Sequence, residues 1–416
     1  MRRLILTCLF VIGLCAALFN FVNFQGLGAQ GEFDTLLLDF REDIPSTKLQ
    51  QDLDKISQQF NVTPKLDNKF SKDDNVYIIK GDKARLKQLR SEFAKDTEFI
   101  EPNYIYKIPK QGQVARLAEY LDPRPEEARE PGVSFTGAND PYYSKQWHLH
   151  NIYVEGAWKQ TKGSGVTVAV IDTGVTQVRD LIETKFVKGY DFVNDREKAN
   201  DDNGHGTHVA GTIAQATNNS WGVAGIAYEA SIMPLKVLSD YGGGTVADIA
   251  EAIRFAADNG ANVINMSLGG GGESQLMREA IDYAHSKGVV IIAAAGNEDA
   301  NGAAYPARYP HVIGVSALGP DGERAPYSNY GAGVDISAPG GSDAGKVLQA
   351  TVDMDNKGEE VFLGLQGTSM ASPHVAGVAA LVRASGVENP DEIENVLLGS
   401  ARAIHEDALN YYGAGQ

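Results

Sequence analysis

The feature that most constrains the fold is a regular alternation of apolar strands and helical segments from residue 136 onward. Continuous runs of Val, Ile and Ala predict strands buried on both faces, at 165–175, 231–238, 261–270, 289–297 and 311–318. Helical spacing of apolar residues lies between these runs, at 206–217, 246–260 and 274–288. This alternation predicts an α/β fold, in which a mostly parallel, doubly wound sheet carries helices on both faces.

Residues 30–110 carry a different pattern and predict a small module of their own. Strand patterns at 35–40 and 76–81 and a closing strand at 98–109 alternate with two helical patterns, at 46–60 and 84–96. With a short strand near 62–66, the order is β-α-β-β-α-β, which is the ferredoxin-like α+β arrangement. Residues 111–135 are rich in charge and proline, so we expect a solvated, protease-accessible linker before the large domain of residues 136–416.

The first 29 residues predict a signal peptide or an N-terminal anchor. Two arginines precede about twenty mostly apolar residues, a run at the upper edge of signal-peptide length. The only cysteines, Cys8 and Cys15, lie inside this run, so a processed chain has no disulfide and depends on packing or metal ions. We therefore expect a secreted or extracytoplasmic protein that meets a membrane only if this segment stays uncleaved.

The charge balance narrows the range of partners. The formal net charge is −17, and nearly all of it falls on residues 136–416. So acidic a domain argues against nucleic acid and anionic membrane surfaces as partners. It suits the binding of hard cations.

Four polar residues stand at strand ends and helix starts of the large domain, where function gathers in such folds. Asp172 closes one strand, Asn297 closes another, His205 begins a helix after a glycine-rich approach, and Ser369 lies at a predicted helix start. Each alone could be a turn former or a helix cap, and Ser369 is a typical N-cap. Together they supply a nucleophile, a base, an orienting carboxylate and an oxyanion donor.

The chemistry of acyl transfer explains why these residue types belong together. A serine hydroxyl is a weak nucleophile until an imidazole takes its proton, and a carboxylate must fix that imidazole. The oxyanion of the tetrahedral intermediate needs preorganised donors, here the Asn297 side-chain amide and the Ser369 backbone N–H. We place Ser369 and Pro373 in the first turn of one buried helix, where a proline is tolerated.

Four sequence stretches in order, AVIDTGV, NGHGTHVAG, AAAGN and GTSMASPHVAG, resemble the subtilisin family of serine peptidases, in its thermitase-like branch. The resemblance implies a serine endopeptidase that cleaves polypeptides through an acyl-enzyme on Ser369, with His205 rather than His208 as the base. It also implies that residues 30–110 are an inhibitory, fold-assisting propeptide of a self-processed zymogen, cut between Lys107 and Ala138. The mature enzyme would be a monomer.

The resemblance further implies where a peptide substrate binds. Two segments would pair with the substrate backbone, and small residues with one carboxylate would form the pocket for the residue before the scissile bond. The expected substrate-binding residues are Gly242, Gly243, Gly244, Ser267, Leu268, Gly269, Ala294, Glu298 and Ala304.

Calcium is the cofactor that the resemblance implies. Its ligands would be the side chains of Asp140, Asp180 and Asn219 and the carbonyl oxygens of Ala216, Trp221 and Val223. A second site after Asp191 stays open. Arg196 stands there in place of an acidic ligand, although Asp195, Asp201 and Asp202 could compensate.

Other interpretations of the sequence are weaker. Residues 340–346 have phosphate-loop spacing, but Val347 replaces the required Ser or Thr. The aspartic-peptidase triplet in IDTGV occurs once, and the histidine pair of HGTH lacks zinc-peptidase spacing. A catalytically silent, peptide-binding pseudopeptidase remains the alternative from another class. The closing NYYGAGQ resembles the start of the family's last segment, so the sequence is either a fragment or lacks a final helix.

Overall fold

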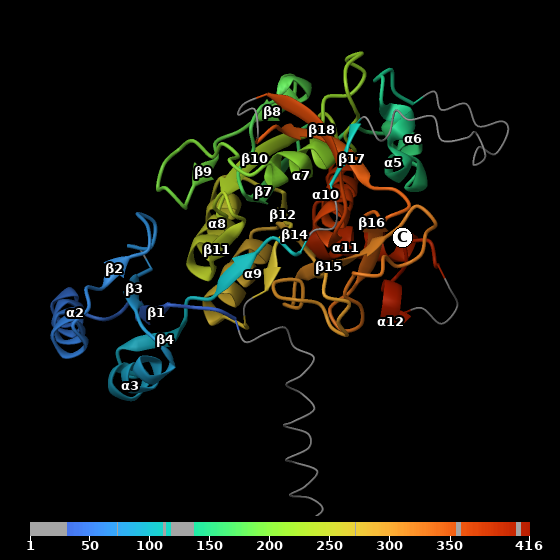
Figure 1. Cartoon of the computed structure of the whole chain (residues 1–416). Coiled ribbons are helices and arrows are strands. Elements are labelled where there is room, and N and C mark those ends of the chain that lie inside the picture. Colours follow the sequence, from blue (N-terminus) through green and yellow to red (C-terminus); the bar gives the residue numbers. More distant parts are fainter. Residues whose placement is uncertain are drawn as a thin grey trace, which may run out of the picture.

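The computed structural model describes residues 31–72, 74–110, 114–117, 137–270, 272–354, 359–404 and 409–416 (Figure 1). The predicted signal or anchor segment and both cysteines lie outside these residues. Within the described ranges, no helix is both long enough and apolar enough to cross a membrane.

A parallel sheet forms the centre of the large domain, in the order β16-β15-β14-β12-β7-β10-β8, with β9 also paired to β10. Its strands are β7 (Thr167–Asp172), β8 (Lys185–Phe186), β9 (Tyr190–Asp191), β10 (Ser231–Lys236), β12 (Val263–Met266), β14 (Val290–Ala294), β15 (Val312–Leu318) and β16 (Ile336–Pro339). Every pairing in this sheet is parallel. The predicted α/β architecture is confirmed, and β16 is a strand that the sequence pattern missed.

Helices cover both faces of this sheet, because alternate side chains of each buried strand point to opposite faces. Val168 and Val170 of β7 pack in one hydrophobic cluster, and Ala169 and Ile171 pack in the other. The first cluster includes side chains of α7 (His205–Ala214), α10 (Thr368–Ala384) and α11 (Pro390–Ser400). The second includes side chains of α8 (Val246–Asp258) and α9 (Gln275–Ser286).

The N-terminal module has the predicted β-α-β-β-α-β order. Its elements are β1 (Thr35–Phe40), α2 (Ser46–Phe60), β2 (Lys65–Leu66), β3 (Val76–Lys80), α3 (Lys83–Phe93) and β4 (Thr97–Pro102). The four strands form an antiparallel sheet in the order β2-β3-β1-β4. Leu36, Leu38 and Phe40 of β1 lie in the module's own core with residues of both helices.

The opposite face of the module's sheet packs on the large domain. Leu37 of β1 and Val76 of β3 belong to the same hydrophobic cluster as residues of α8 and α9. Phe70 extends this contact, since its ring lies 5.1 Å from that of Tyr190 and 5.6 Å from that of Phe255. Figure 1 shows the blue module on one side of the domain, beside these helices.

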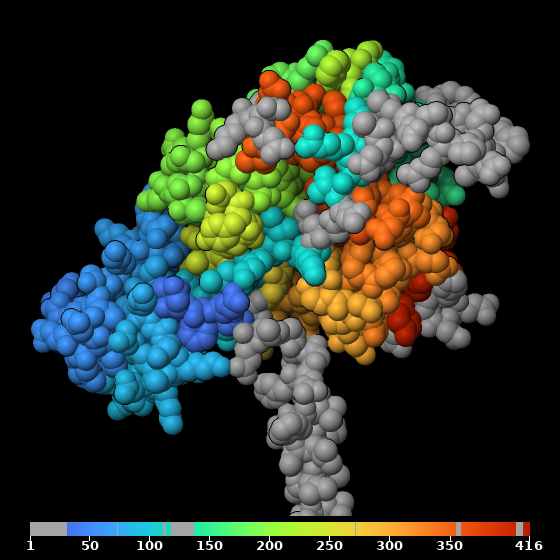
Figure 2. Space-filling view, viewed as in Figure 1, coloured from blue at the N-terminus to red at the C-terminus, as the bar shows by residue number. Residues whose placement is uncertain are grey.

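The chain after β4 runs across the surface of the large domain, as the cyan atoms in Figure 2 show. It forms β5 (Ile105–Lys107), which lies between β11 (Gly243–Thr245) and β13 (Gly269–Gly270) in a small antiparallel sheet. The predicted closing strand of 98–109 is therefore two strands. The first belongs to the module, and the second pairs with the large domain.

A second small sheet joins part of the expected linker to the large domain. The strands β17 (Val347–Val352) and β18 (Glu360–Leu365) form a hairpin, and β6 (Ala115–Arg116) pairs with the outer edge of β18. Residues 114–117 thus depart from the solvated linker predicted for 111–135, because an exposed strand edge offers them backbone hydrogen bonds.

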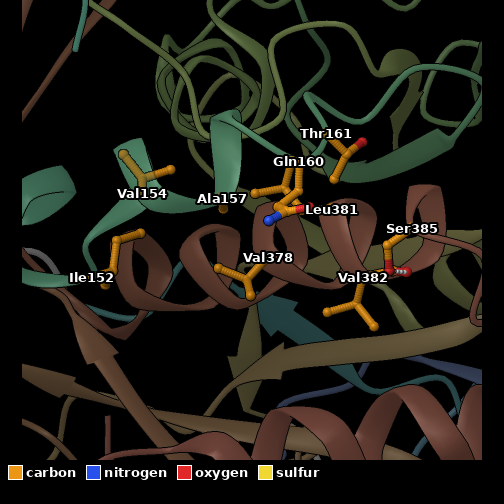
Figure 3. Close-up of a pocket in the computed structure, with 9 residues that line it drawn as sticks. All are labelled: Ile152, Val154, Ala157, Gln160, Thr161, Val378, Leu381, Val382 and Ser385. Carbon is orange, nitrogen blue, oxygen red and sulfur yellow. Dashed lines mark hydrogen bonds between the residues drawn. The ribbon is translucent and has the colours of Figure 1, made fainter.

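Short helices complete the fold: α5 (Trp147–Asn151), α6 (Val154–Trp158) and α12 (Leu409–Tyr412). The closing residues fold back on the domain, where Ser337 of β16 donates its N–H to the carbonyl of Gly415. An apolar pocket of about 260 Å³ lies between α6 and the second half of α10, lined by Val154, Val378 and Leu381 among others (Figure 3). It contains none of the four predicted catalytic residues.

Candidate active site

Asp172 and His205 meet at the carboxyl end of β7. Asp172 is the last residue of β7 and His205 the first residue of α7, and both side chains are buried. The His205 Nδ1 atom lies 2.7 Å from Asp172 Oδ1, which also accepts the Thr173 N–H. The carboxylate therefore fixes the ring. Nε2, the other ring nitrogen, is buried and has no partner within the described structure, so it is available to take a proton.

Ser369 is the second residue of α10 and is not its N-cap. Gly367 precedes the helix without any side-chain cap, so the N-cap interpretation of Ser369 is wrong. Its hydroxyl donates to the Ser267 carbonyl oxygen at 3.2 Å instead of to His205. A rotation of this side chain would therefore have to precede proton transfer to the imidazole.

Pro373 lies in the second turn of α10, which corrects the predicted position in the first turn. At this place a proline leaves the carbonyl of residue i−4, which is Ser369, without its helical donor. The Ser267 hydroxyl replaces that donor and bonds to the Ser369 carbonyl oxygen at 2.8 Å. Ser267 therefore supports Ser369 with both its hydroxyl and its carbonyl group.

Asn297 follows β14 and faces Ser369 with a fixed amide orientation. Its Oδ1 atom accepts two hydrogen bonds from Thr368, one from the backbone N–H at 2.9 Å and one from the hydroxyl at 2.8 Å. The Nδ2 group must then point the other way. A Cβ atom on Gly367, whose φ is +153°, would lie 3.0 Å from Nδ2, which explains the glycine at that position.

The group that Asn297 binds is a carbonyl of the chain's own N-terminal part. Asn297 Nδ2 donates to the Lys110 carbonyl oxygen at 2.9 Å. The Ser369 backbone N–H makes no hydrogen bond within the described residues, so it remains free as the second donor predicted for this site.

The predicted glycines lie on both sides of this segment. Lys107 pairs with Gly243 and with Gly269, and Tyr106 pairs with Gly244. Gly242 accepts the Ile108 N–H at 2.9 Å. The segment that leads to Lys110 therefore lies as an added strand between two segments of the large domain, and we call the space between these two segments the cleft.

The remaining predicted substrate residues have unequal positions. Leu268 and Ala294 are fully buried in the core, and Ser267 is buried against Ser369. Ala304 is partly exposed and donates its N–H to the Ala295 carbonyl, beside Gly269. Glu298 is exposed, and its carboxylate accepts a hydrogen bond from Asn329.

The predicted calcium ligands also come together. Asp140 accepts the N–H groups of Asn218 and Asn219, and Asp180 bonds to the Asn219 amide at 2.9 Å. Burial, with Glu360 and Asp140 nearby, raises the pKa of Asp180 to about 8.

The backbone carbonyls around this cluster fit a hard cation. The described structure shows no hydrogen bond to the carbonyl oxygens of Ala216, Trp221 or Val223, and Ala216 and Val223 are buried. Buried carbonyls are normally hydrogen-bonded, so unpaired ones beside two carboxylates favour an oxygen-ligated ion such as Ca²⁺.

The possible second calcium site has a different structure. The Arg196 guanidinium lies 2.8 Å from Asp191, so a side-chain cation already pairs with that carboxylate. Asp202 pairs with Lys236 at 2.6 Å, and Asp201 accepts hydrogen bonds from Thr173 and Thr207. Asp195 bonds to the hydroxyl of Tyr190. These carboxylates have separate partners and do not converge on one point.

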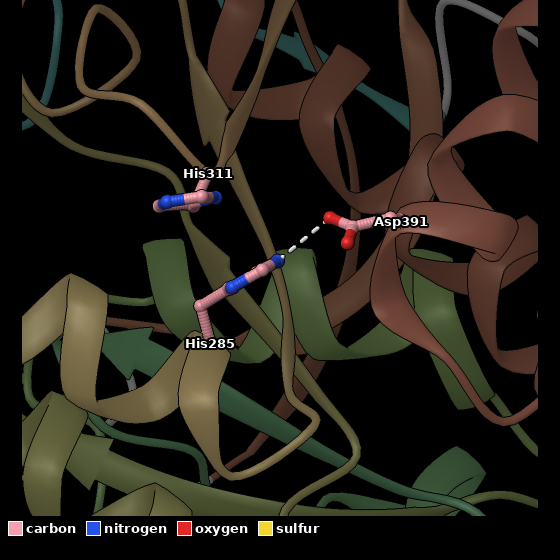
Figure 4. A group of neighbouring side chains, drawn as sticks. All are labelled: His285, His311 and Asp391. Atoms are coloured by element: carbon pink, nitrogen blue, oxygen red, sulfur yellow. Dashed lines mark hydrogen bonds and ion pairs between the residues drawn. The ribbon is translucent and has the colours of Figure 1, made fainter.

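A surface group of His285, His311 and Asp391 has potential metal ligands within 4.8 Å of one another (Figure 4). His285 bonds to Asp391 at 2.9 Å, and the two imidazole rings stack with centroids 3.9 Å apart and planes 23° apart. Nearly parallel rings direct their in-plane lone pairs side by side, so they do not converge on one ion. We assign no metal to this group.

The sequence did not indicate which contacts two supporting residues make. Thr368 orients the Asn297 amide, and His208 fastens α7 to the β17–β18 hairpin through the carbonyls of Val347 and Leu363. Burial lowers the pKa of His208 to about 3, so its ring stays neutral. The position of Thr368 next to the predicted nucleophile, Ser369, was the only hint of its role.

Comparisons with known proteins agree with this geometry. The model of the subtilase family matches residues 163–415. A thermophilic serine proteinase of Bacillus sp. (strain AK1) is 40% identical over 73% of this chain and 74% of its own length. Thermitase of Thermoactinomyces vulgaris is 41% identical over 60% of this chain and 86% of its own.

A solved structure covers more of the chain. Fervidolysin of Fervidobacterium pennivorans, described as a keratinolytic enzyme related to subtilisin, aligns with 94% of this chain and 62% of its own, at 30% identity and a TM-score of 0.75. The chain therefore belongs to the subtilase family and is a serine endopeptidase.

Proposed function

We propose that the protein is made as a zymogen whose module, residues 30–110, inhibits the enzyme until Ser369 cuts the chain after Lys110. The observation that carries this proposal is the hydrogen bond from Asn297 Nδ2 to the Lys110 carbonyl oxygen. An oxyanion donor binds the carbonyl of the residue before the scissile bond. The pairing of β5 with both glycine segments supports the same direction of the chain through the cleft.

The cut follows from the groups around Lys110. The Ser369 hydroxyl attacks the Lys110 carbonyl carbon while His205 Nε2 takes its proton, and Asn297 with the Ser369 N–H stabilises the oxyanion. His205 then gives the proton to the departing amine of Gln111. Water, deprotonated by the same imidazole, hydrolyses the Lys110 ester and frees Ser369. The products are a carboxylate on Lys110 and an amine on Gln111.

The same cleft would accept foreign polypeptides by backbone pairing with Gly242, Gly243, Gly244 and Gly269. Small walls, including the partly exposed Ala304, favour a broad range of side chains before the scissile bond. The exposed carboxylate of Glu298 favours basic ones, in agreement with Lys110 in the chain itself.

We further propose that Asp140, Asp180 and Asn219, with the carbonyls of Ala216, Trp221 and Val223, bind one structural calcium ion. The ion would offset the repulsion of carboxylates that are buried together. At the second candidate site Arg196 replaces the ion. The apolar N-terminal segment supports export, by a signal peptide or an anchor, and the mature enzyme is expected to act as a monomer.

Three preparations test the processing step. The purified protein should lose its module, and sequencing of its new N-terminus should begin at Gln111. Ser369→Ala should stay intact, and Asn297→Ala should process slowly. A Ser369→Ala protein that still separates from its module in pure form would exclude self-cleavage, and a new N-terminus elsewhere would refute the assignment to Lys110.

A further inference from the structure

Within the described residues, most of the outer edge of β18 is unpaired, and this edge lies near α7, the helix that begins with His205. Along its other edge, β18 pairs with β17 over six residue pairs, from Val347 with Leu365 to Val352 with Glu360. On the outer edge only Leu363 and Gly364 are paired, with Arg116 and Ala115. No other described strand pairs with this edge. Such edges accept extended peptides by backbone hydrogen bonding.

This edge has a fixed position relative to His205. His208 lies one helical turn after the catalytic base and binds the Leu363 carbonyl at 3.1 Å. Thr351 of β17 also donates its hydroxyl to the Gly204 carbonyl, directly before His205. The hairpin is therefore fastened to α7, and a chain on β18 lies at a defined distance from the reacting bond.

A groove of about 350 Å³ runs beside the edge. Its lining joins His205 and Asn203 to the apolar side chains of Val361, Leu363 and Leu365. These three alternate along β18, so they share one face of the strand. Val114 and Arg116 line the same groove, and so does the acidic residue Asp353.

The chain direction identifies which part of a substrate reaches this groove. The Lys110 carbonyl is bound by Asn297, so Val114, Ala115 and Arg116 are the fourth to sixth residues after the bond to be cut. Four residues lie between Lys110 and Ala115, so the five steps from one to the other span at most about 18 Å when extended. One continuous chain can therefore occupy both places.

We propose that the outer edge of β18 is a substrate subsite for the fourth to sixth residues after the scissile bond, and that residues 114–116 of this chain are its first occupant. The inference rests on the proposed cut after Lys110. The subsite takes an extended polypeptide by backbone pairing with Leu363 and Gly364, and the fourth residue, here the half-exposed Val114, lines the groove.

A consequence for the processed enzyme follows. After the cut, residues 111–117 remain joined to the large domain, so they return to β18 at a high effective concentration. They compete with every substrate that extends six residues past its cleaved bond. A substrate that ends after three residues does not meet this competition.

Quenched fluorescent peptides test the subsite. All share residues 104–110 as the half before the bond, followed by Gln-Gly-Gln or by Gln-Gly-Gln-Val-Ala-Arg. With the processed protein, we expect the longer peptide to have about a tenfold higher kcat/KM, the order of magnitude of two added backbone hydrogen bonds with apolar burial. Values equal within twofold would overturn the subsite.

N-methylation provides the matched control, because neighbouring N–H groups of a strand point to opposite sides. The long peptide is methylated on the backbone nitrogen of either the fifth or the sixth residue after the bond. Only one of these two methylations should return kcat/KM to that of the short peptide, and the other should leave kcat/KM unchanged. Equal effects of both, or of neither, would contradict pairing with β18. If no peptide is cleaved, the proposed specificity of the cleft is wrong, which is a separate result.

Two chain variants test the first occupant, in preparations whose intact mass shows that residues 111–117 are retained. Ala115→Pro and Arg116→Pro each remove one N–H, and Ala115→Gly keeps it as the control. The proline at the position sensitive to methylation should raise kcat/KM for the long peptide about threefold or more, without changing the short one. A rise in kcat/KM for the other proline variant, or for neither variant, would refute occupation of β18 by residues 114–116.

Discussion

Asp39 of β1 should make release of the module depend on pH. Its side chain lies on the face of the module's sheet that packs on the large domain, and only 7% of it is exposed. Burial, together with Glu98 and Asp74 of the module and Glu279 of α9, raises its pKa to about 8, while Arg254 of α8 acts in the opposite direction. The docked module therefore binds a proton that the separated module releases.

The direction and the size of this pH dependence follow from proton linkage. In the separated module Asp39 is expected to return to a pKa of about 4. Between the two values, separation releases one proton, so the docked state is most stable at low pH and loses about 1.4 kcal/mol per pH unit as the pH rises. From pH 6 to pH 8 the docking constant should fall about fiftyfold from this group alone. Burial and the nearby Asp74 raise the pKa of Glu251 to about 7, so Glu251 adds to the same trend.

The fraction of full activity that the processed protein reaches measures how much of the module has been released. Processed protein is diluted into buffers between pH 6 and pH 8, and activity on a short peptide is normalised to fully active enzyme at each pH, which removes the titration of the catalytic groups. Release should become steeply more complete as the pH rises. Asp39→Asn, which has no proton to lose, should flatten the dependence.

Asp43 provides the matched control. Its carboxylate is exposed and pairs with Arg41 at 2.9 Å, and this contact holds its pKa below the usual value. Asp43→Asn makes the same change of charge within the module but should leave the dependence between pH 6 and pH 8 intact. If Asp39→Asn and the unchanged protein show the same slope, the buried proton does not control docking.

Three further predictions concern the large domain. Asn297→Ala should lower kcat about 10²–10³-fold in steady-state assays, with little change in KM, and this magnitude is that of the equivalent amide in another subtilase. An unchanged kcat would exclude Asn297 as an oxyanion donor. Calcium chelation should lower the Tm by about 5 °C or more, and Asp180→Asn should abolish that response; an equal shift in both proteins would refute the assigned ligands. Gly377→Ala should destabilise the domain by about 1–3 kcal/mol in urea, since its Cβ would lie 2.8 Å from Ile226 Cβ, whereas Gly399→Ala, with nothing within 4 Å, should stabilise it by about 0.5–1 kcal/mol.

The sequence predicted those parts of the fold in which local pattern and tertiary structure agree. Long apolar runs located the main parallel strands, because a strand buried on both faces needs no polar residues. The short strand β16 ends in proline and carries no such run, so it was missed. The strand β6 was missed because its pairing with β18 joins residues far apart in the chain. The local β17–β18 hairpin was missed as well.

The candidate site, too, could be predicted only in part from the sequence. The chemistry of acyl transfer, together with the resemblance to the subtilisin family, predicted Asp172, His205, Ser369 and Asn297 at strand ends and helix starts. The sequence could not place Pro373, because the helix begins at Thr368 after an uncapped glycine and its start has no side-chain signal. The contact between Asn297 and Lys110 joins residues 187 positions apart, so only the folded chain reveals it.

The two ends of the segment between the module and the large domain are fixed in one structure, and this has a kinetic consequence. Lys110 is bound at Asn297 while Asp140 already accepts the N–H groups of Asn218 and Asn219. The bond to be cut and the enzyme that cuts it therefore belong to the same folded chain. The first cleavage is expected to be a unimolecular event, with a half-time that stays constant when the protein is diluted a hundredfold. Later inhibition by the freed module becomes bimolecular and weakens on the same dilution.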